Sequence, residues 1–316
     1  MEYHASDATS QPQPLTKTAK VSTLRPYPYY RWTQLFRVVV VLLGLAYWLY
    51  RSPIDERIDR LWQGMRLTWF VRFDTCEPIV AAYAFIVWVN MFRFFDAFCP
   101  FLQRFRIIQT VPSRVERLWV NGEVGHGTFS YFAFLVPMLV FDYFHPRRVL
   151  PAWTPTLGQL VGQVALSVLV YDCLFYGIHT LYHRWPAVAS LHAKHHSMKP
   201  LAGSDVVRVS VIDGLSQVLC SAAAVNICRS HSLARLLHNV VITYLLTEAH
   251  SQYDFPWSIH RLLPSGLMGG PIRHEIHHHT GKAYFSQFFS FLDRWSGNEL
   301  SEAELDVALQ DFAWRP

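Results

Sequence analysis

Hydrophobic and polar positions along this chain separate into whole segments. Four long apolar stretches stand out, at residues 35–50, 78–95, 124–141 and 149–171. A helix needs about 20 predominantly apolar residues to cross the hydrocarbon core of a bilayer. The pattern therefore predicts four transmembrane helices, of which the first is short and the third contains Pro137, a residue that neighbouring helices can accommodate.

Two weaker apolar stretches follow, at residues 214–228 and 236–247. The second is too short to cross a bilayer comfortably. We expect the pair to form a further apolar hairpin or to lie partly in the interface, with the chain returning to the side it left. Residues 1–34 are polar and rich in Ser, Thr, Gln and Pro, which predicts a disordered cytoplasmic tail.

The composition is typical of a membrane protein. Of the 316 residues, 51% are hydrophobic and only 16% are charged, against about 25% in soluble domains. The net charge of +5 is spread along the chain without a block of Lys and Arg, so nothing favours nucleic-acid binding. The five cysteines form no Cys-x-x-Cys pair, which argues against a disulfide framework or a cysteine zinc site.

Basic residues predict the orientation of the chain. Lys and Arg precede the first stretch and recur between the second and third, whereas the segment between the first and second mixes Arg with Asp and Glu. Cytoplasmic segments carry the excess of Lys and Arg in membrane proteins. We therefore expect the N-terminus in the cytoplasm, and after four spans the segment that follows residue 171 returns there.

Histidines gather just after the fourth stretch. His179 and His183 are four residues apart, so on a continuing helix both rings project from one face. The motif HxxHH occurs twice, and at helical spacing its three ring nitrogens are expected to converge. With one histidine directly after the last apolar stretch, the candidate metal ligands are His179, His183, His192, His195, His196, His250, His274, His277 and His278.

The number of candidate ligands favours two metal ions over one. A transition-metal site of this kind takes about four to six ligands, and imidazole suits Fe, Zn, Cu or Ni. Carboxylates are expected beside the histidines to orient the rings. Asp172, Glu248, Asp254 and Glu275 are near the histidines in sequence, and Asp254 could coordinate directly. No catalytic side chain beyond the metal centre is indicated.

Other interpretations of the histidines stay open at this point. Single histidines such as His231 and His238 are expected to be ordinary side chains. His274, Glu275 and His278 spell HExxH, the signature of zinc proteases in which Glu is the general base. A protease would leave six or more histidines without a role. A metal-ion transporter would place its ligands near the middle of the membrane, whereas these histidines follow the ends of apolar stretches.

The segments HTLYH, LHAKHH and HEIHH, in this order and separated by an apolar pair, resemble the three histidine boxes of the fatty acid hydroxylase/sterol desaturase superfamily. The stretch 248–278 is most similar to the cholesterol-hydroxylating members of that superfamily. The aromatic segment 283–295 resembles the closing segment of the same proteins.

Three residues depart from the pattern of the superfamily. Gln252 replaces the usual Gly of an HSGY segment. Arg273 stands where relatives often have a further histidine, which leaves a tenth ligand open. His279 extends the last box and could compete with His278 in register.

Together with the apolar pattern, the resemblance predicts an all-α integral membrane protein with about four transmembrane helices, the apolar hairpin and a histidine-rich helical cap for two metals on the cytoplasmic side. The predicted organisation is an N-terminal tail (1–34), N-terminal transmembrane helices (35–150), a catalytic domain (151–297) and a C-terminal tail (298–316).

The resemblance also implies an activity. The nine histidines would hold two iron ions in a monooxygenase of the endoplasmic reticulum membrane, which hydroxylates an unactivated C–H bond of a lipid. A sterol or other terpenoid drawn from the bilayer is the expected substrate. The reaction would use O2 and electrons from NAD(P)H, delivered by a separate reductase and cytochrome b5. A desaturase of the same superfamily is the alternative.

Overall fold

The computed structural model describes residues 27–108, 135–145, 147–264 and 266–311. Within these ranges the chain is helical, and β contacts are confined to two isolated bridges, which confirms the predicted all-α class. The α-helices are α1 (Tyr30–Leu49), α2 (Arg51–Met65), α3 (Cys76–Phe98), α6 (Leu135–Phe144), α7 (Leu157–Arg184), α8 (Pro186–Ala193), α9 (Val211–Ile227), α10 (Ser232–His250), α11 (Ile259–Leu262), α12 (Gly270–Thr280), α13 (Phe291–Trp295) and α14 (Glu302–Asp311). Short 3-10 turns are η1 (Phe70–Arg72), η2 (Pro100–Phe105), η3 (His195–Ser197) and η4 (Gly203–Val207).

Three of the described helices, α1, α3 and α7, are long and apolar enough to cross a membrane. They correspond to the first, second and fourth predicted spans. Leu, Val, Trp and Phe side chains on their outer faces are exposed, as lipid-facing positions would be. Most of the predicted third span, 124–141, lies outside the described residues, and its described part belongs to α6.

The start of α7 differs from the prediction. The apolar pattern begins at residue 149, but the helix begins at Leu157. The Thr156 side chain accepts a hydrogen bond from the Gln159 amide, and the Gln159 side chain accepts one from the Thr156 amide. This capping box sets the helix start, and hydropathy alone does not detect it. At its other end α7 continues to Arg184, as the spacing of the first histidine pair requires.

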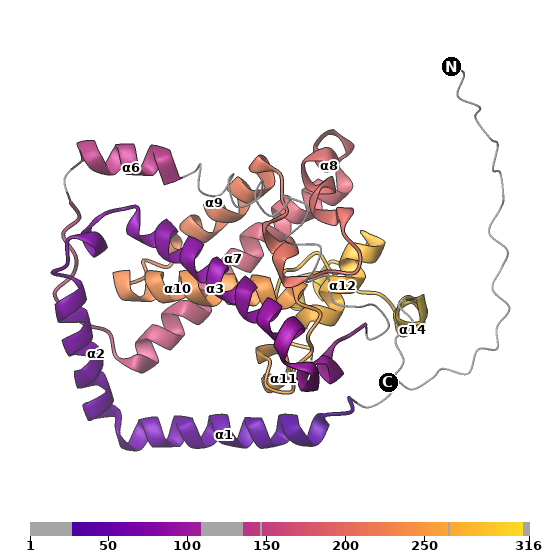
Figure 1. The fold of residues 1–316 in the computed structure, drawn as a ribbon, viewed down its shortest axis with the longest axis horizontal. Coiled ribbons are helices and arrows are strands. Elements are labelled where there is room, and N and C mark those ends of the chain that lie inside the picture. The colour runs from indigo at the N-terminus through magenta and orange to yellow at the C-terminus, as the bar shows by residue number, and fades with distance from the viewer. Residues whose placement is uncertain (1–26, 109–134, 146, 265, 312–316) are drawn as a thin grey trace, which may run out of the picture.

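The two weaker apolar stretches form α9 and α10. Helix α10 has 19 residues, longer than its apolar run, and most of its side chains are buried. It packs chiefly against α3 and α7, whereas α9 packs chiefly against α7. Helix α10 is the central helix of the bundle (Figure 1), so protein rather than lipid surrounds most of it.

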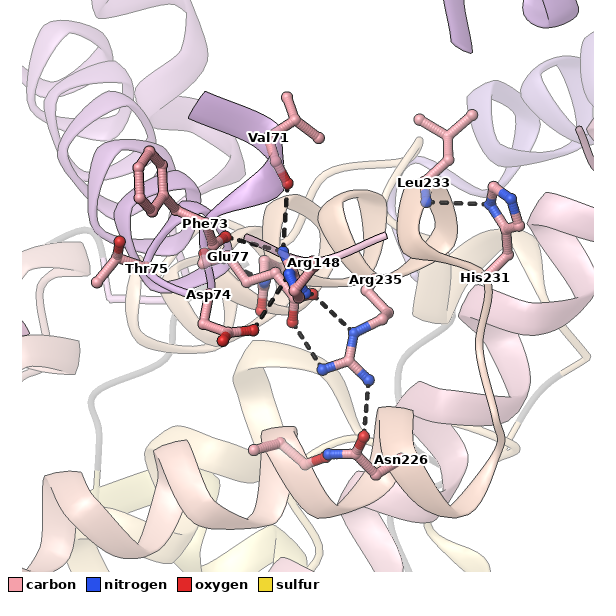
Figure 2. Close-up of polar contacts among 12 residues, drawn as sticks. Val71, Phe73, Asp74, Thr75, Glu77, Arg148, Asn226, His231, Leu233 and Arg235 are labelled. Atoms are coloured by element: carbon pink, nitrogen blue, oxygen red, sulfur yellow. Dashed lines mark hydrogen bonds and ion pairs between the residues drawn. The ribbon is translucent and has the colours of Figure 1, made fainter. Parts of the chain in front are cut away.

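Helices α3, α7 and α10 run in the same direction, so their N-terminal ends meet at one end of the bundle. A charged cluster joins them there (Figure 2). The Glu77 carboxylate lies 2.9 Å from the Arg148 guanidinium and 2.8 Å from that of Arg235. Arg148 also donates to the Phe73 carbonyl at 2.9 Å. Each buried charge thus has a partner, as burial of ions requires.

Helix α1 runs the opposite way along the outside of the bundle (Figure 1). Near its start, Arg37 donates to the backbone carbonyls of Arg261 and Leu263. Near its end, Tyr47 contacts Asp55 and the amide of Gly158, at the start of α7. The N-terminal end of α1 and the C-terminal ends of α3, α7 and α10 therefore share one end of the bundle.

Candidate metal centre

The nine predicted histidines all reach this second end of the bundle, from five separate elements. His179 and His183 lie on the last turns of α7, and His250 is the last residue of α10. The second box spans the end of α8 and the turn η3, and the third box lies on α12. The long helices α7 and α10 thus position part of the site, and the short elements α8, η3 and α12 position the rest.

The structure divides the nine imidazoles into two clusters. In each, one nitrogen per ring lies within 4.8 Å of the others. We call them the five-histidine cluster and the four-histidine cluster. The five-histidine cluster contains His179, His183, His192, His196 and His277, and the four-histidine cluster contains His195, His250, His274 and His278.

This division corrects the expectation that the three nitrogens of each HxxHH motif converge. In α12, His274 and His278 share one cluster, whereas His277 enters the other. Adjacent helical residues project about 100° apart, so His277 and His278 lie on opposite sides of His274 and can face different clusters. The second box divides in the same way, with its middle histidine apart. Each HxxHH motif therefore serves both clusters.

The protonation of the rings follows from their outer hydrogen bonds. His179 Nδ1 lies 2.7 Å from the Phe285 carbonyl oxygen, and His192 Nδ1 lies 2.8 Å from the Asp213 carboxylate. Both acceptors require a proton on Nδ1, so Nε2 of each neutral ring carries a lone pair. These two Nε2 atoms stand 3.1 Å apart. With no proton between them, two facing lone pairs repel unless a cation lies between the rings.

In the four-histidine cluster one ring is fixed in the same way. His250 Nδ1 donates to the Leu246 carbonyl at 2.7 Å, which leaves a lone pair on its Nε2. That atom lies 3.1 Å from Nε2 of His195 and 3.0 Å from Nε2 of His274. His278 Nε2 lies 3.1 Å from the same His274 atom. The donors of both clusters thus point inward.

The spacing of the nitrogens fits a six-coordinate ion. With nitrogen about 2.1 Å from the metal, adjacent ligands stand about 3.0 Å apart in an octahedral site and about 3.4 Å apart in a tetrahedral one. Five pairs of nitrogens stand 3.0–3.1 Å apart, the separation of adjacent octahedral ligands, and all nitrogens of one cluster lie within 4.8 Å of one another. Four or five imidazoles at this spacing leave one or two positions for other ligands.

Burial keeps these rings neutral. It lowers the pKa of His274 and His278 well below the ordinary imidazole value, with neighbouring histidines acting in the same direction. Burial likewise lowers the pKa of His250 to about 4 and that of His196 to about 2. At neutral pH the lone pairs are therefore available to a metal ion.

Three of the four predicted carboxylates bond groups other than the histidines of the two clusters. Asp254 pairs with His260 at 2.9 Å and with Arg261, so the expectation that it coordinates a metal directly is not met. Asp172 accepts hydrogen bonds from backbone amides instead of an imidazole. Glu248 accepts hydrogen bonds from the Tyr244 and Ser258 hydroxyls.

Glu275 and the departures from the histidine-box pattern form one local network. Both oxygens of Glu275 are occupied, by Gln252 Nε2 at 2.8 Å, His279 Nε2 at 3.2 Å and the Leu201 amide. His279 thus lies outside the four-histidine cluster, which contains His278. Gln252 has φ +68°, a conformation that glycine adopts without strain.

Arg273 does not supply a tenth ligand. It pairs with Glu299 and lies over the Tyr284 ring at 5.0 Å. Among the described residues, the two clusters contain only the nine histidines. His231 and His238 lie outside the clusters, as expected of ordinary side chains: His231 accepts from the Leu233 amide (Figure 2), and His238 bonds two serines.

Asp213 is the residue near the centre that the sequence analysis missed. It lies in the first turn of α9, is fully buried and accepts from His192 Nδ1. Ser210 caps the same helix and bonds the Asp213 amide at 3.2 Å. The Ser-x-x-Asp pattern directly before an apolar run is a helix-start signal that could have drawn attention to this carboxylate.

One cavity gives access to both clusters. It has a volume of about 290 Å³ and is lined by rings of the five-histidine cluster, including His183 and His196, and by His278 of the other. Lys199 also lines it. A small molecule entering here would reach donors of both clusters.

Comparisons with known proteins agree with this geometry. Residues 164–298 match the model of the fatty acid hydroxylase family. The matched segment contains all nine histidines of the two clusters, and the resemblance of the three histidine boxes to this superfamily is confirmed.

Similar proteins from three vertebrates match more than half of the chain. Cholesterol 25-hydroxylase of Rattus norvegicus is 28% identical over 76% of this chain and 82% of its own length. The Homo sapiens protein of that name is 27% identical over 79% of this chain and 90% of its own length. Cholesterol 25-hydroxylase-like protein 1, member 2, of Danio rerio is 33% identical over 54% of this chain and 62% of its own length. No solved structure matches the chain.

Proposed function

We propose that the protein is a membrane-bound di-iron monooxygenase that hydroxylates an unactivated C–H bond of a sterol or other terpenoid lipid. The observation that carries this proposal is the pair of histidine clusters, whose inward nitrogens stand 3.0–3.1 Å apart within the fatty acid hydroxylase domain. The names of the cholesterol 25-hydroxylase relatives support a sterol as the substrate.

The donor set supports iron. All donors are neutral imidazole nitrogens at octahedral spacing, which suits Fe better than the four-coordinate geometry of structural zinc. When bound, the two iron ions would supply the activation of O2 that oxidation of an unactivated C–H bond needs and that amino-acid side chains lack.

The chain's own contribution is position, protonation state and shelter from water. Phe285 and Asp213 hold the protons of two rings on Nδ1, so that Nε2 faces inward. Burial keeps the rings neutral and excludes competing solvent. In the overall reaction one oxygen atom enters the lipid and the other leaves as water, which consumes two electrons and two protons. A reductase and cytochrome b5 would deliver those electrons from NAD(P)H.

The position of the clusters supports a substrate drawn from the bilayer. They lie at the ends of α7 and α10, next to helices with exposed apolar faces. We place this end of the bundle, together with the start of α1, on the cytoplasmic face of the endoplasmic reticulum membrane. The excess of Lys and Arg near that end supports this orientation.

The alternatives differ in what they require of these residues. A zinc protease needs the Glu of its HExxH motif free to act on a metal-bound water, whereas Glu275 is engaged by Gln252, His279 and the Leu201 amide. A transporter needs ligands near mid-membrane, whereas these lie at helix ends. A lipid desaturase would use the same clusters, and only its product would distinguish it from the proposed hydroxylase.

Turnover under isotopically labelled O2 tests the proposal. The purified protein, with a reductase and cytochrome b5, is given sterols and then fatty acyl lipids, and products are analysed by mass spectrometry. We expect a sterol or terpenoid alcohol that carries one labelled oxygen atom. A product that has lost two hydrogens without gaining oxygen would identify a desaturase. Absence of any lipid product in the metal-loaded protein would contradict the proposal.

A further inference from the structure

An irregular loop, residues 283–289, lies against the five-histidine cluster after the end of α12. Its Phe285 carbonyl accepts from His179 Nδ1 at 2.7 Å, and its Ala283 carbonyl accepts from His277 Nδ1 at 2.8 Å. The Phe285 ring also packs against three rings of the cluster, with centroid distances of 5.2–6.2 Å. The loop thus determines which nitrogen of His179 and of His277 faces inward.

Two buried carboxylates hold this loop. Asp293 accepts hydrogen bonds from the amides of residues 285 and 286, at 2.8 and 3.0 Å. Asp172, on α7, accepts from the next three amides, those of residues 287, 288 and 289, at 2.8–3.0 Å. Five consecutive N–H groups therefore point at two carboxylates, with Asp172 0% and Asp293 2% exposed. A loop whose amides are not paired in a helix or an extended strand needs such acceptors when those amides are buried.

We propose that Asp172 and Asp293 are positioning residues for the five-histidine cluster, which they control through the backbone of the 283–289 loop. The inference rests on the proposed function, because it assumes that the cluster holds a metal ion. Neither carboxylate touches a histidine of the cluster in the described contacts. Each fixes a stretch of backbone, and the backbone carbonyls fix the rings.

The arrangement predicts an effect on one cluster and not on the other. No carbonyl of this loop accepts from a ring of the four-histidine cluster in the described contacts. The outer nitrogen of His250 donates to Leu246 of its own helix. Loosening the loop therefore misorients His179 and His277 and leaves the four-histidine cluster intact. A general loss of stability would weaken both clusters together.

The test uses the full-length protein in detergent or nanodiscs, stripped of metal and titrated anaerobically with Fe(II) or with Co(II) as a spectroscopic probe. The variants are Asp293→Asn and Asp172→Asn, each of which replaces one acceptor oxygen by a donor. The matched control is Asp142→Asn, because Asp142 is also buried and also accepts from two backbone amides, those of Asp74 and Thr75, at the other end of the bundle.

We expect wild type and Asp142→Asn to bind about two ions per chain. In Asp293→Asn and Asp172→Asn, one site should weaken by about 10- to 100-fold, the usual effect of losing a residue that orients metal ligands, and the Co(II) spectrum of that site should change. At a free metal concentration that just fills both sites of the wild type, the stoichiometry of these variants should fall from about two ions per chain to about one. Because Asp172 lies inside α7 and its variant could misfold, Asp293→Asn alone decides the matter.

Two results would overturn the inference. One is equal weakening of both sites in Asp293→Asn, and the other is an unchanged affinity at both sites in a folded Asp293→Asn protein. A wild-type chain that binds no metal would instead overturn the proposed function, and this inference with it.

Discussion

The two ends of the bundle formed by α3, α7 and α10 differ in how their polar side chains are paired. At the N-terminal end, Glu77 lies between Arg148 and Arg235, so every charge has its complement within the chain (Figure 2). At the C-terminal end, nine neutral rings direct nitrogens at one another, and between His179 and His192 two lone pairs face each other with no proton between them. The first arrangement is complete by itself. The second is complete only with a cation. Clustered polar groups therefore indicate a structural role at the first end and metal binding at the second.

The comparison also holds between single histidines. His238 is as deeply buried as the ligand candidates, but its nitrogens lie 2.8 and 3.0 Å from the hydroxyls of Ser167 and Ser221. His195 has one nitrogen 3.1 Å from the Nε2 lone pair of His250 and one buried nitrogen without a partner. Burial alone therefore does not distinguish a ligand from a packed side chain, whereas the partners of both ring nitrogens do.

The largest effect is expected from His195→Ala. It removes one of four donors from the four-histidine cluster, so lipid turnover should be abolished and one ion per chain lost, while the protein stays in the membrane. The matched control is His238→Gln, which should keep two ions per chain. Metal analysis and product assays on the same preparations check both. Retained turnover in His195→Ala would remove this residue from the ligand set.

At the other end, Glu77→Gln should act on stability alone. It leaves Arg148 and Arg235 without their shared counter-charge, and loss of one partner of a partly buried ion pair costs about 2–4 kcal/mol of unfolding free energy. Chemical denaturation in detergent measures the loss, and metal stoichiometry should not change. A metal loss as large as that of His195→Ala would break the distinction between the two ends.

An intermediate effect is expected from Asp213→Asn. The change removes the charge that holds the proton on His192 Nδ1, so the five-histidine cluster should bind metal about 10- to 100-fold more weakly. The four-histidine cluster should keep its affinity. Competition with a chelator resolves the two sites. Unchanged affinity at both sites would show that the Asp213 contact does not tune the metal.

The smallest effect is expected from Gln252→Gly. Glycine relieves the strain of φ +68° but loses the 2.8 Å bond to Glu275, so the two changes of about 1 kcal/mol each nearly cancel. Gln252→Ala keeps the strain and loses the bond, and should be less stable than the glycine variant by about 1 kcal/mol. Thermal unfolding ranks the two. An alanine variant as stable as the glycine variant would contradict this account of the strained turn.

The sequence predicted the elements that depend on local composition. The spans at 35–50 and 78–95 correspond to α1 and α3, which extend a few residues further. The start of α7 was wrong because a capping interaction at Thr156, and not hydropathy, sets it. Helix α10 was predicted too short because it continues past the apolar run through Glu248 and His250, polar residues that tertiary partners bury.

The candidate site was predicted as a set of residues but not as an arrangement. Helical spacing identified the nine histidines, because i and i+4 rings share a face. It did not show that the middle histidine of each HxxHH motif enters the other cluster, since that depends on where α7, α10 and α12 stand around it. The partners of the outer nitrogens, Asp213 and the 283–289 loop, come from distant segments.

The most direct test of the central claim is the metal content of the purified protein, measured together with X-ray absorption at the iron edge. The account predicts about two iron ions per chain, each surrounded by nitrogen at about 2.1 Å in a coordination number above four. A single zinc ion in a tetrahedral shell, or a chain that retains no metal after reconstitution, would contradict it.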